Sequence, residues 1–112
     1  MQEQHTVKAK SFAFALEIIR LYRQLVEQRE YVLSRQLLRS GTSIGANIEE
    51  ASAAQSRSDF LSKMAIASKE ARETKYWLRM IASAEDSIKE TARRLWLEAK
   101  ELHLIFAKIY RS

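Results

Sequence analysis

Two long stretches of evenly spaced apolar residues restrict the fold more than any other feature of the sequence. In regions 60–81 and 88–109, apolar or small side chains recur at alternating intervals of four and three residues. The positions are Phe60, Met64, Ala67, Ala71, Thr74, Leu78 and Ile81, then Ile88, Ala92, Leu95, Ala99, Leu102, Phe106 and Ile109. This period puts the repeating residues on one face of a long helix, where another helix can cover them.

The first half of the chain has the same helical character. Region 8–28 carries two adjacent apolar stripes, so we expect a helix that is buried over a wide arc. The alternative is that its extra apolar residues form a surface for self-association. The first stripe holds Phe12, Leu16, Ile19 and Val26, and the second holds Ala15, Ile18, Tyr22 and Leu25. Region 30–54 has the inward positions Leu33, Leu37, Ile44, Ile48 and Ala51, with Ser40 and Asn47 as polar interruptions.

The near absence of turn-forming residues argues against a β-protein. The 112 residues include no proline and only two glycines, whereas the turns of sheet proteins depend on both. We therefore predict an all-α chain, folded as one domain over residues 1–112 into an antiparallel up-down-up-down four-helix bundle. The expected helices are residues 8–28, 30–54, 58–83 and 87–110. Ser56 or Ser58 is expected to cap the third helix, and Ser87 with Glu90 to form a capping box on the fourth.

Composition limits the classes of function. The chain has no cysteine, which excludes a disulfide scaffold and thiolate metal ligands. Its polar N-terminus lacks the apolar core of a signal peptide, and no apolar run reaches the length of a membrane span, so we expect a cytoplasmic location. Lys and Arg outnumber Asp and Glu by 19 to 14, a net charge of +5. This excess favours anionic partners such as nucleic acid without requiring them.

Both glycines of the chain, Gly41 and Gly45, lie inside a region that is otherwise helical. Each costs a helix roughly 1 kcal/mol relative to alanine, so a close neighbour or a bend is expected there. Ala67, Ala71 and Thr74 give the third helix a small surface. We expect this surface to pack closely against the two glycines.

Three segments resemble a known family, and the likeness extends over about residues 8–110. Segment 43–50 reads SIGANIEE and is similar to the pattern Ser-Ile-Pro-Ala-Asn-Ile-x-Glu of the 23S rRNA intervening sequence proteins, or S23 family. Segment 66–78 reads IASKEARETKYWL and is similar to the family pattern Ile-Ala-x-Lys-Glu-Ala-x-Glu-Thr-x-Tyr-Trp-Leu. Segment 59–64, DFLSKM, also fits. Gly45 stands where the family often has proline, which leaves open whether the second helix bends.

The resemblance implies an antiparallel four-helix bundle that assembles into a ring, typically a homopentamer. A related group, the accessory proteins of diversity-generating retroelements, forms similar five-fold barrels with basic surfaces that bind nucleic acid. We assign structural roles to the signature residues Gly41, Gly45, Asn47, Glu50, Glu70 and Glu73. Asn47 is expected to hydrogen-bond a backbone group across a helix contact. These three acids and Glu49 are expected to pair with Arg20, Arg23 or Arg39.

Basic residues form the candidate nucleic-acid site. Arg72, Lys75 and Arg79 follow one stripe of the third helix outside its apolar seam. Arg35 and Arg39 form an i, i+4 pair on the second helix, and Arg57 lies in the turn between the two helices. These six residues could contact phosphates, and a symmetric ring would multiply the contacts. The alternative is a solvated charged face with no ligand, because no known nucleic-acid-binding motif accompanies the stripes.

The fourth helix carries apolar residues beyond those that its seam requires. Trp96, Leu97, Leu104 and Ile105 lie off the seam. They either widen the face that is buried in the bundle or form an interface between copies of the chain. We name these four residues as the candidate oligomer interface, with Trp96 as its anchor.

No constellation for catalysis is visible. Glu70 and Glu73 are spaced as in carboxylate metal sites, but di-iron bundles also need Glu-x-x-His, and Lys100 stands three residues before His103. No nucleophile has an adjacent base and no glycine-rich phosphate loop occurs. We therefore expect no enzyme activity, no metal and no cofactor. The predicted function is nucleic-acid binding by an oligomeric bundle, with or without a nucleic-acid-processing partner protein. The alternative is a purely structural oligomeric adaptor for a partner protein.

Overall fold

The structure, a computed structural model, describes the backbone of residues 2–111 and the side chains of residues 7–110. Four long helices make up almost all of it: α1 (Gln2–Glu27), α2 (Val32–Ser52), α3 (Arg57–Ala84) and α4 (Lys89–Arg111). A short 3₁₀ turn, η1 (Asp86–Ile88), precedes α4. The described part contains no strand, so the all-α prediction is confirmed there. Helix α1 begins at Gln2, before the expected residue 8.

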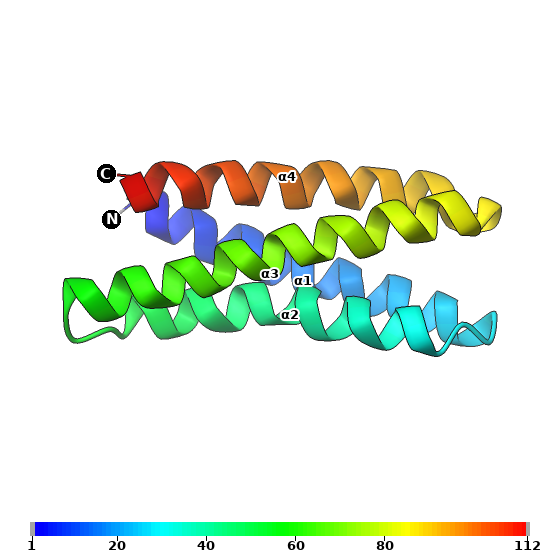
Figure 1. The fold of residues 1–112 in the computed structure, drawn as a ribbon, viewed down its shortest axis with the longest axis horizontal. Helices are drawn as coiled ribbons and strands as arrows, with labels where there is room; N and C mark the ends of the chain where they lie inside the picture. The colour runs from blue at the N-terminus through cyan, green and yellow to red at the C-terminus, as the bar shows by residue number, and fades with distance from the viewer. Residues whose placement is uncertain (1, 112) are drawn as a thin grey trace.

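The helices lie side by side in an elongated body of 44 × 19 × 19 Å (Figure 1). Each helix packs against the next along the chain, and α1 closes the set by packing against α4. The connections α1–α2 and α3–α4 lie at one end of the body. The α2–α3 connection lies at the other end, beside both chain termini (Figure 1). Helices α3 and α4 therefore pack against each other over much of their length.

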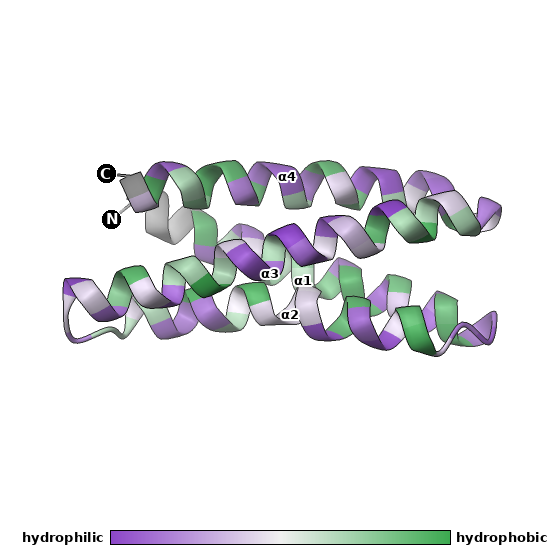
Figure 2. Ribbon diagram, viewed as in Figure 1, coloured by the Kyte–Doolittle hydropathy of each residue, from purple (hydrophilic) through white to green (hydrophobic). Residues whose placement is uncertain are grey.

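The predicted seams of α3 and α4 form half of the core. All their positions are buried except Phe60 and Ile109, which are partly buried near the end of the body that holds the chain termini. Hydrophobic and hydrophilic bands alternate along every helix, as expected of helices that each bury one face (Figure 2). Within the described residues, no helix combines the length and the apolar character that crossing a membrane requires.

The prediction for α1 was wrong about one of its two apolar stripes. Phe12 is 67% exposed and Leu16 is 40% exposed. The core side of α1 instead consists of Val7, Phe14, Ile18, Leu21 and Leu25. Phe12 lies about 200° around the helix from Phe14, so both cannot face the same core. The core side of α1 therefore includes Ile18 and Leu25 of the second stripe, whereas Phe12 and Leu16 of the first stripe face outward.

Local hydrogen bonds fix where the helices begin and end. Helix α1 ends in a Schellman-type turn, with Glu30 N donating to Leu25 O at 2.9 Å and Arg29 in the left-handed region at φ 64°. Ser56 caps α3 by accepting from Asp59 N at 3.0 Å, as predicted. The predicted capping box of α4 is wrong. The turn η1 stands in its place, and Ser87 Oγ instead accepts from Gln28 Nε2 at 3.0 Å, which links the two connections.

Candidate functional site

The two glycines bring α2 close to α1. A Cβ atom on Gly41 would lie 2.9 Å from both Cγ1 and Cγ2 of the buried Ile18. A Cβ on Gly45 would lie 3.5 Å from the carbonyl oxygen of Ser11, an ordinary contact distance. The expected contact between the glycines and α3 is therefore wrong, because the glycines face α1. Helix α2 continues without interruption through Gly45.

The side of α2 that faces α3 carries polar residues instead. The buried hydroxyls of Ser40 and Thr74 hydrogen-bond at 2.9 Å. Ser43 Oγ donates to Glu70 Oε2 at 3.0 Å. Asn47 Nδ2 donates to the backbone oxygen of Ser43 at 2.9 Å, so it bonds within its own helix and not across the contact as expected.

Arg39 extends this contact with two acids of α3. Its Nη1 donates to Glu70 Oε2 at 3.1 Å, and its Nη2 pairs with Glu73 Oε2. Trp77 Nε1 also donates to Glu73 Oε2, at 3.1 Å. Burial by itself would raise the pKa of Glu73, but the hydrogen bonds from Trp77 and Arg39 and the charge of Arg39 outweigh it and lower this pKa. The hydrogen bond to Glu73 raises the pKa of Arg39.

These acids therefore hold α2 and α3 together, in agreement with the predicted pairing to Arg39. The side chain of Glu70 is only 12% exposed, and its ion pair and its hydrogen bond from Ser43 compensate its charge. Glu50, the remaining signature acid, lies exposed on α2. Within the described part of the chain, no three metal-ligating side chains converge on a common point.

The opposite edge of α3 carries positive charge without acids. Six residues, which we call the basic face, come from the facing edges of α3 and α4: Arg72, Lys75, Arg79, Lys89, Arg93 and Lys100. None of the six has an ion pair among the described side chains. Two acids of α4 lie toward α1, where Glu98 pairs with Arg94 and Glu101 pairs with Lys10. Glu17 of α1 also pairs with Arg94.

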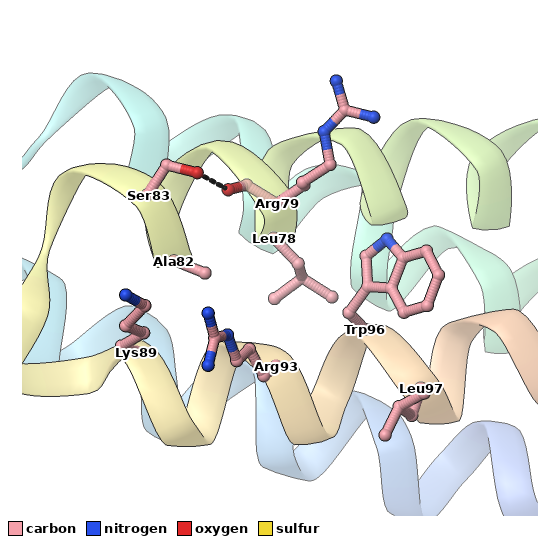
Figure 3. A pocket seen from close by; sticks show the side chains of 8 residues that line it. All are labelled: Leu78, Arg79, Ala82, Ser83, Lys89, Arg93, Trp96 and Leu97. Carbon is pink, nitrogen blue, oxygen red and sulfur yellow. Dashed lines mark hydrogen bonds between the residues drawn. The ribbon is translucent and has the colours of Figure 1, made fainter.

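A surface groove of about 670 Å³ opens in the basic face between α3 and α4. Its lining residues are Leu78, Arg79, Ala82, Ser83, Lys89, Arg93, Trp96 and Leu97 (Figure 3). Leu78 and Ala82 lie between the cations, and the indole of Trp96 stands at one end of the groove (Figure 3). The ammonium groups of Lys75 and Lys100 lie 5.7 and 5.6 Å from the centroid of this ring, within cation–π range.

His103 reports the positive potential of the same face. Burial lowers the pKa of His103, and the nearby charges of Lys75 and Arg72 lower it further. No acid contributes to this shift. An anion placed on the face would therefore meet several uncompensated cations at once.

The structure separates the six basic residues that the sequence singled out. Arg72, Lys75 and Arg79 lie on the basic face. Arg39 pairs with acids, while Arg35 donates to the Tyr31 carbonyl oxygen at 3.2 Å. Arg57, the first residue of α3, lies about 33 Å along the helix from Arg79.

Sequence reasoning missed the half of the basic face that α4 contributes. These residues follow the buried seam of α4 by one position, at Lys89, Arg93, Trp96, Lys100 and His103. They therefore repeat the four-and-three spacing of that seam, and this repeat was a signal that could have revealed them.

The four candidate interface residues also fall into different places. Leu97 and Leu104 are each 61% exposed and lie two turns apart on the outer side of α4. Trp96 is partly buried and stands beside the groove, whereas Ile105 packs partly buried against the core. Two of the four residues thus remain on the outer surface as a short apolar line.

The sequence and the fold can be compared with known proteins. The family model described as 23S rRNA-intervening sequence protein matches residues 3–108. The chain belongs to this family. A solved structure from Bacteroides thetaiotaomicron VPI-5482, described as a protein of unknown function from the S23 ribosomal protein family, is 46% identical. The match covers 98% of this chain and 99% of that chain, with a TM-score of 0.94. A comparison with curated proteins finds no match.

In this member of the 23S rRNA-intervening sequence protein family, the signature segments build the α2–α3 contact. Ser43 of segment 43–50 donates to Glu70 of segment 66–78 across this contact. Asn47 and Trp77 support it from within their own helices, by hydrogen bonds to Ser43 and Glu73. The α4 half of the basic face lies outside both segments. Arg72 and Lys75 of the basic face lie inside segment 66–78, at positions that the family pattern leaves open. The residues that define the pattern thus contribute to the packing of the bundle, and the basic face uses positions that the pattern does not fix.

Proposed function

We propose that this protein is a non-enzymatic, oligomeric, antiparallel four-helix bundle that binds RNA or DNA through the basic face. The observation that carries the proposal is the row of six cations along α3 and α4, none of which pairs with an acid among the side chains that the structure describes. Cations that are already paired gain little from a phosphate, because the existing pair must first be broken. Unpaired cations release the counterions of the nucleic acid at no such cost.

The dimensions of the basic face suit a nucleic-acid backbone. Lys89 and Lys100 lie about 16 Å apart along α4, since a helix rises 1.5 Å per residue. This length corresponds to about five nucleotide steps of a duplex strand at 3.4 Å each. The face can therefore meet several successive phosphates, which gives affinity without reading the sequence.

Self-association is the second part of the proposal. Leu97 and Leu104 expose an apolar line on the outer side of α4, which a second copy could cover. The family resemblance favours a ring of five copies, which would place five basic faces on one particle and increase avidity. Light scattering should then give about five times the 13.0 kDa of one chain. A monomer at the concentrations of the binding assay would contradict the ring.

Charge reversal with a matched control tests the binding proposal. Arg72→Glu, Lys75→Glu and Arg79→Glu together should weaken binding to RNA and DNA at least about 100-fold at low salt, because three phosphate contacts become repulsions. The control, Arg23→Glu, Arg35→Glu and Arg57→Glu, changes net charge equally on exposed residues away from the groove. It should retain affinity within a few-fold, as measured by fluorescence anisotropy.

Two other results of this experiment would count against binding through the basic face. Equal losses in both triple variants would show that net charge, and not the basic face, governs binding. An oligomer of wild-type protein that binds neither RNA nor duplex DNA at low salt would contradict the proposal. That result would favour the alternative function, a structural oligomeric adaptor that contacts a partner protein.

A further inference from the structure

The groove at Trp96 differs chemically from the rest of the basic face. Elsewhere the face offers flexible cations, which suit phosphates of any nucleic acid. The groove adds an apolar floor of Leu78 and Ala82 and an aromatic wall, with Arg79, Lys89 and Arg93 around it. A duplex keeps its bases paired and stacked, so they are not free to stack on an aromatic side chain. An unpaired base has a free π-face and gains from stacking on an aromatic side chain.

We propose that this groove holds an unpaired nucleotide of single-stranded RNA or DNA, with its base against Trp96 and its phosphates near Arg79, Lys89 and Arg93. The inference rests on the proposed nucleic-acid binding and names the form of nucleic acid that the groove selects. Its volume, about 670 Å³, lies within the range of about 300–1,000 Å³ of small-ligand sites and can admit a base with its sugar.

Trp96 itself lines the groove. The other lining residues come from positions 78–83 of α3 and 89–97 of α4. Lys75 and Lys100, whose ammonium groups lie 5.7 and 5.6 Å from the centroid of the ring, fall outside both spans. The base would therefore approach the ring from a groove whose lining does not include these two lysines.

Charge complementarity selects this occupant over an apolar peptide. Three of the eight lining residues are cations that lack an ion pair among the described side chains. An apolar segment in the groove would remove water from these cations without replacing it, which is costly. A nucleotide supplies both an apolar ring for the floor and the wall and phosphates for the cations.

Substitution of Trp96 distinguishes single strands from duplexes. We would compare Trp96→Leu and Trp96→Phe with wild type, using labelled oligo(dT) and oligo(U) of about 12 nucleotides and a duplex of equal length. Trp96→Leu should weaken single-strand binding about tenfold, because one stacking contact is lost. Trp96→Phe should restore most of that affinity. Duplex affinity should stay within about twofold in both variants, since the phosphate contacts remain.

A second readout uses wild-type geometry at the groove. Trp77→Phe removes the other indole of the chain and leaves Trp96 as the sole fluorophore. Single strands should then quench its emission, whereas duplexes should not. Equal losses of single-strand and duplex binding in Trp96→Leu, or no quenching by bound single strands, would overturn this inference and leave the proposed function intact. A wild-type protein that binds neither form would overturn both.

Discussion

The contacts of α2 and the contact between α3 and α4 use polar residues in opposite ways. Around α2, polar side chains are paired: Arg39 meets Glu70 and Glu73, and Ser40 meets Thr74. Between α3 and α4 the charges have one sign and face solvent around a groove. The same helix, α3, thus contributes acids to one neighbour and cations beside the other. Paired charges specify which helices pack together, and unpaired charges of one sign remain available for a ligand.

The strongest test of the α2 side alters its glycines. Gly41→Ala should destabilise the fold by about 1–2 kcal/mol, because its Cβ would meet the stiff, buried Ile18 and this clash outweighs the gain in helix propensity. Gly45→Ala, the matched control, should stabilise the fold by up to about 1 kcal/mol, since its Cβ would make only ordinary contacts. Urea denaturation at one fixed protein concentration measures both variants.

Nucleic-acid affinity should be unchanged in both glycine variants under conditions where they are folded. A Gly41→Ala protein as stable as wild type would show that α2 does not approach α1 this closely. A stable Gly41→Ala protein with impaired binding would instead show that the α2 contacts affect nucleic-acid binding. The two regions would then not have separate roles.

Removal of Arg39 should produce a smaller loss of stability. Arg39→Met leaves Glu70 and Glu73 without their cation and should cost about 1 kcal/mol, a value reduced by the half-exposed position of Arg39. Arg35→Met, one turn earlier on α2, should change stability by less than about 0.5 kcal/mol, because Arg35 has no ion pair among the described residues. Neither change should weaken nucleic-acid binding more than about twofold, because each variant loses a single charge that lies outside the basic face.

Arg39→Met could instead lose as much binding as the triple variant of Arg72, Lys75 and Arg79. That result would place Arg39 in the nucleic-acid site. The distinction between paired and unpaired cations would then be wrong.

The smallest expected effect is a pH dependence of binding. Burial and the charges of Lys75 and Arg72 lower the pKa of His103. A bound phosphate would offset those charges and raise this pKa, so binding would favour the protonated imidazole. Affinity should therefore rise a few-fold as pH falls from about 7.5 to about 5.5, the range in which histidines titrate.

His103→Gln removes this titration and serves as the control. Its affinity should vary much less with pH over the same range, at constant ionic strength and with oligonucleotides that lack a terminal phosphate. The same pH dependence in wild type and His103→Gln would show that the nucleic acid does not approach this part of the basic face.

The sequence predicted the helices well and their mutual arrangement less well. The strict spacing of Ile88 to Phe106 identified buried residues correctly, because a period of 3.5 leaves one choice of face. Region 8–28 offered two apolar stripes, and periodicity alone could not show that Phe12 would face outward. The glycines predicted a close contact but not its partner, since a small surface fits α1 as well as α3.

The sequence pattern identified only the α3 half of the basic face. Arg72, Lys75 and Arg79 were visible as a stripe within one helix. Their union with Lys89, Arg93 and Lys100 depends on which edge of α4 faces α3, a property of the assembled bundle. Likewise, Arg35 and Arg39 look alike in the sequence, and only the position of Glu70 and Glu73 across the contact separates a paired from an unpaired cation.

Lysine footprinting tests most directly whether nucleic acid binds to the basic face. Acetylation of each lysine is measured by mass spectrometry with and without saturating RNA or DNA. We expect Lys75, Lys89 and Lys100 to become strongly protected. Lys69, only six residues before Lys75 on the same helix, should keep its reactivity. Equal protection of Lys69 and Lys75, or protection confined to lysines away from the facing edges of α3 and α4, would contradict the assignment of nucleic-acid binding to the basic face.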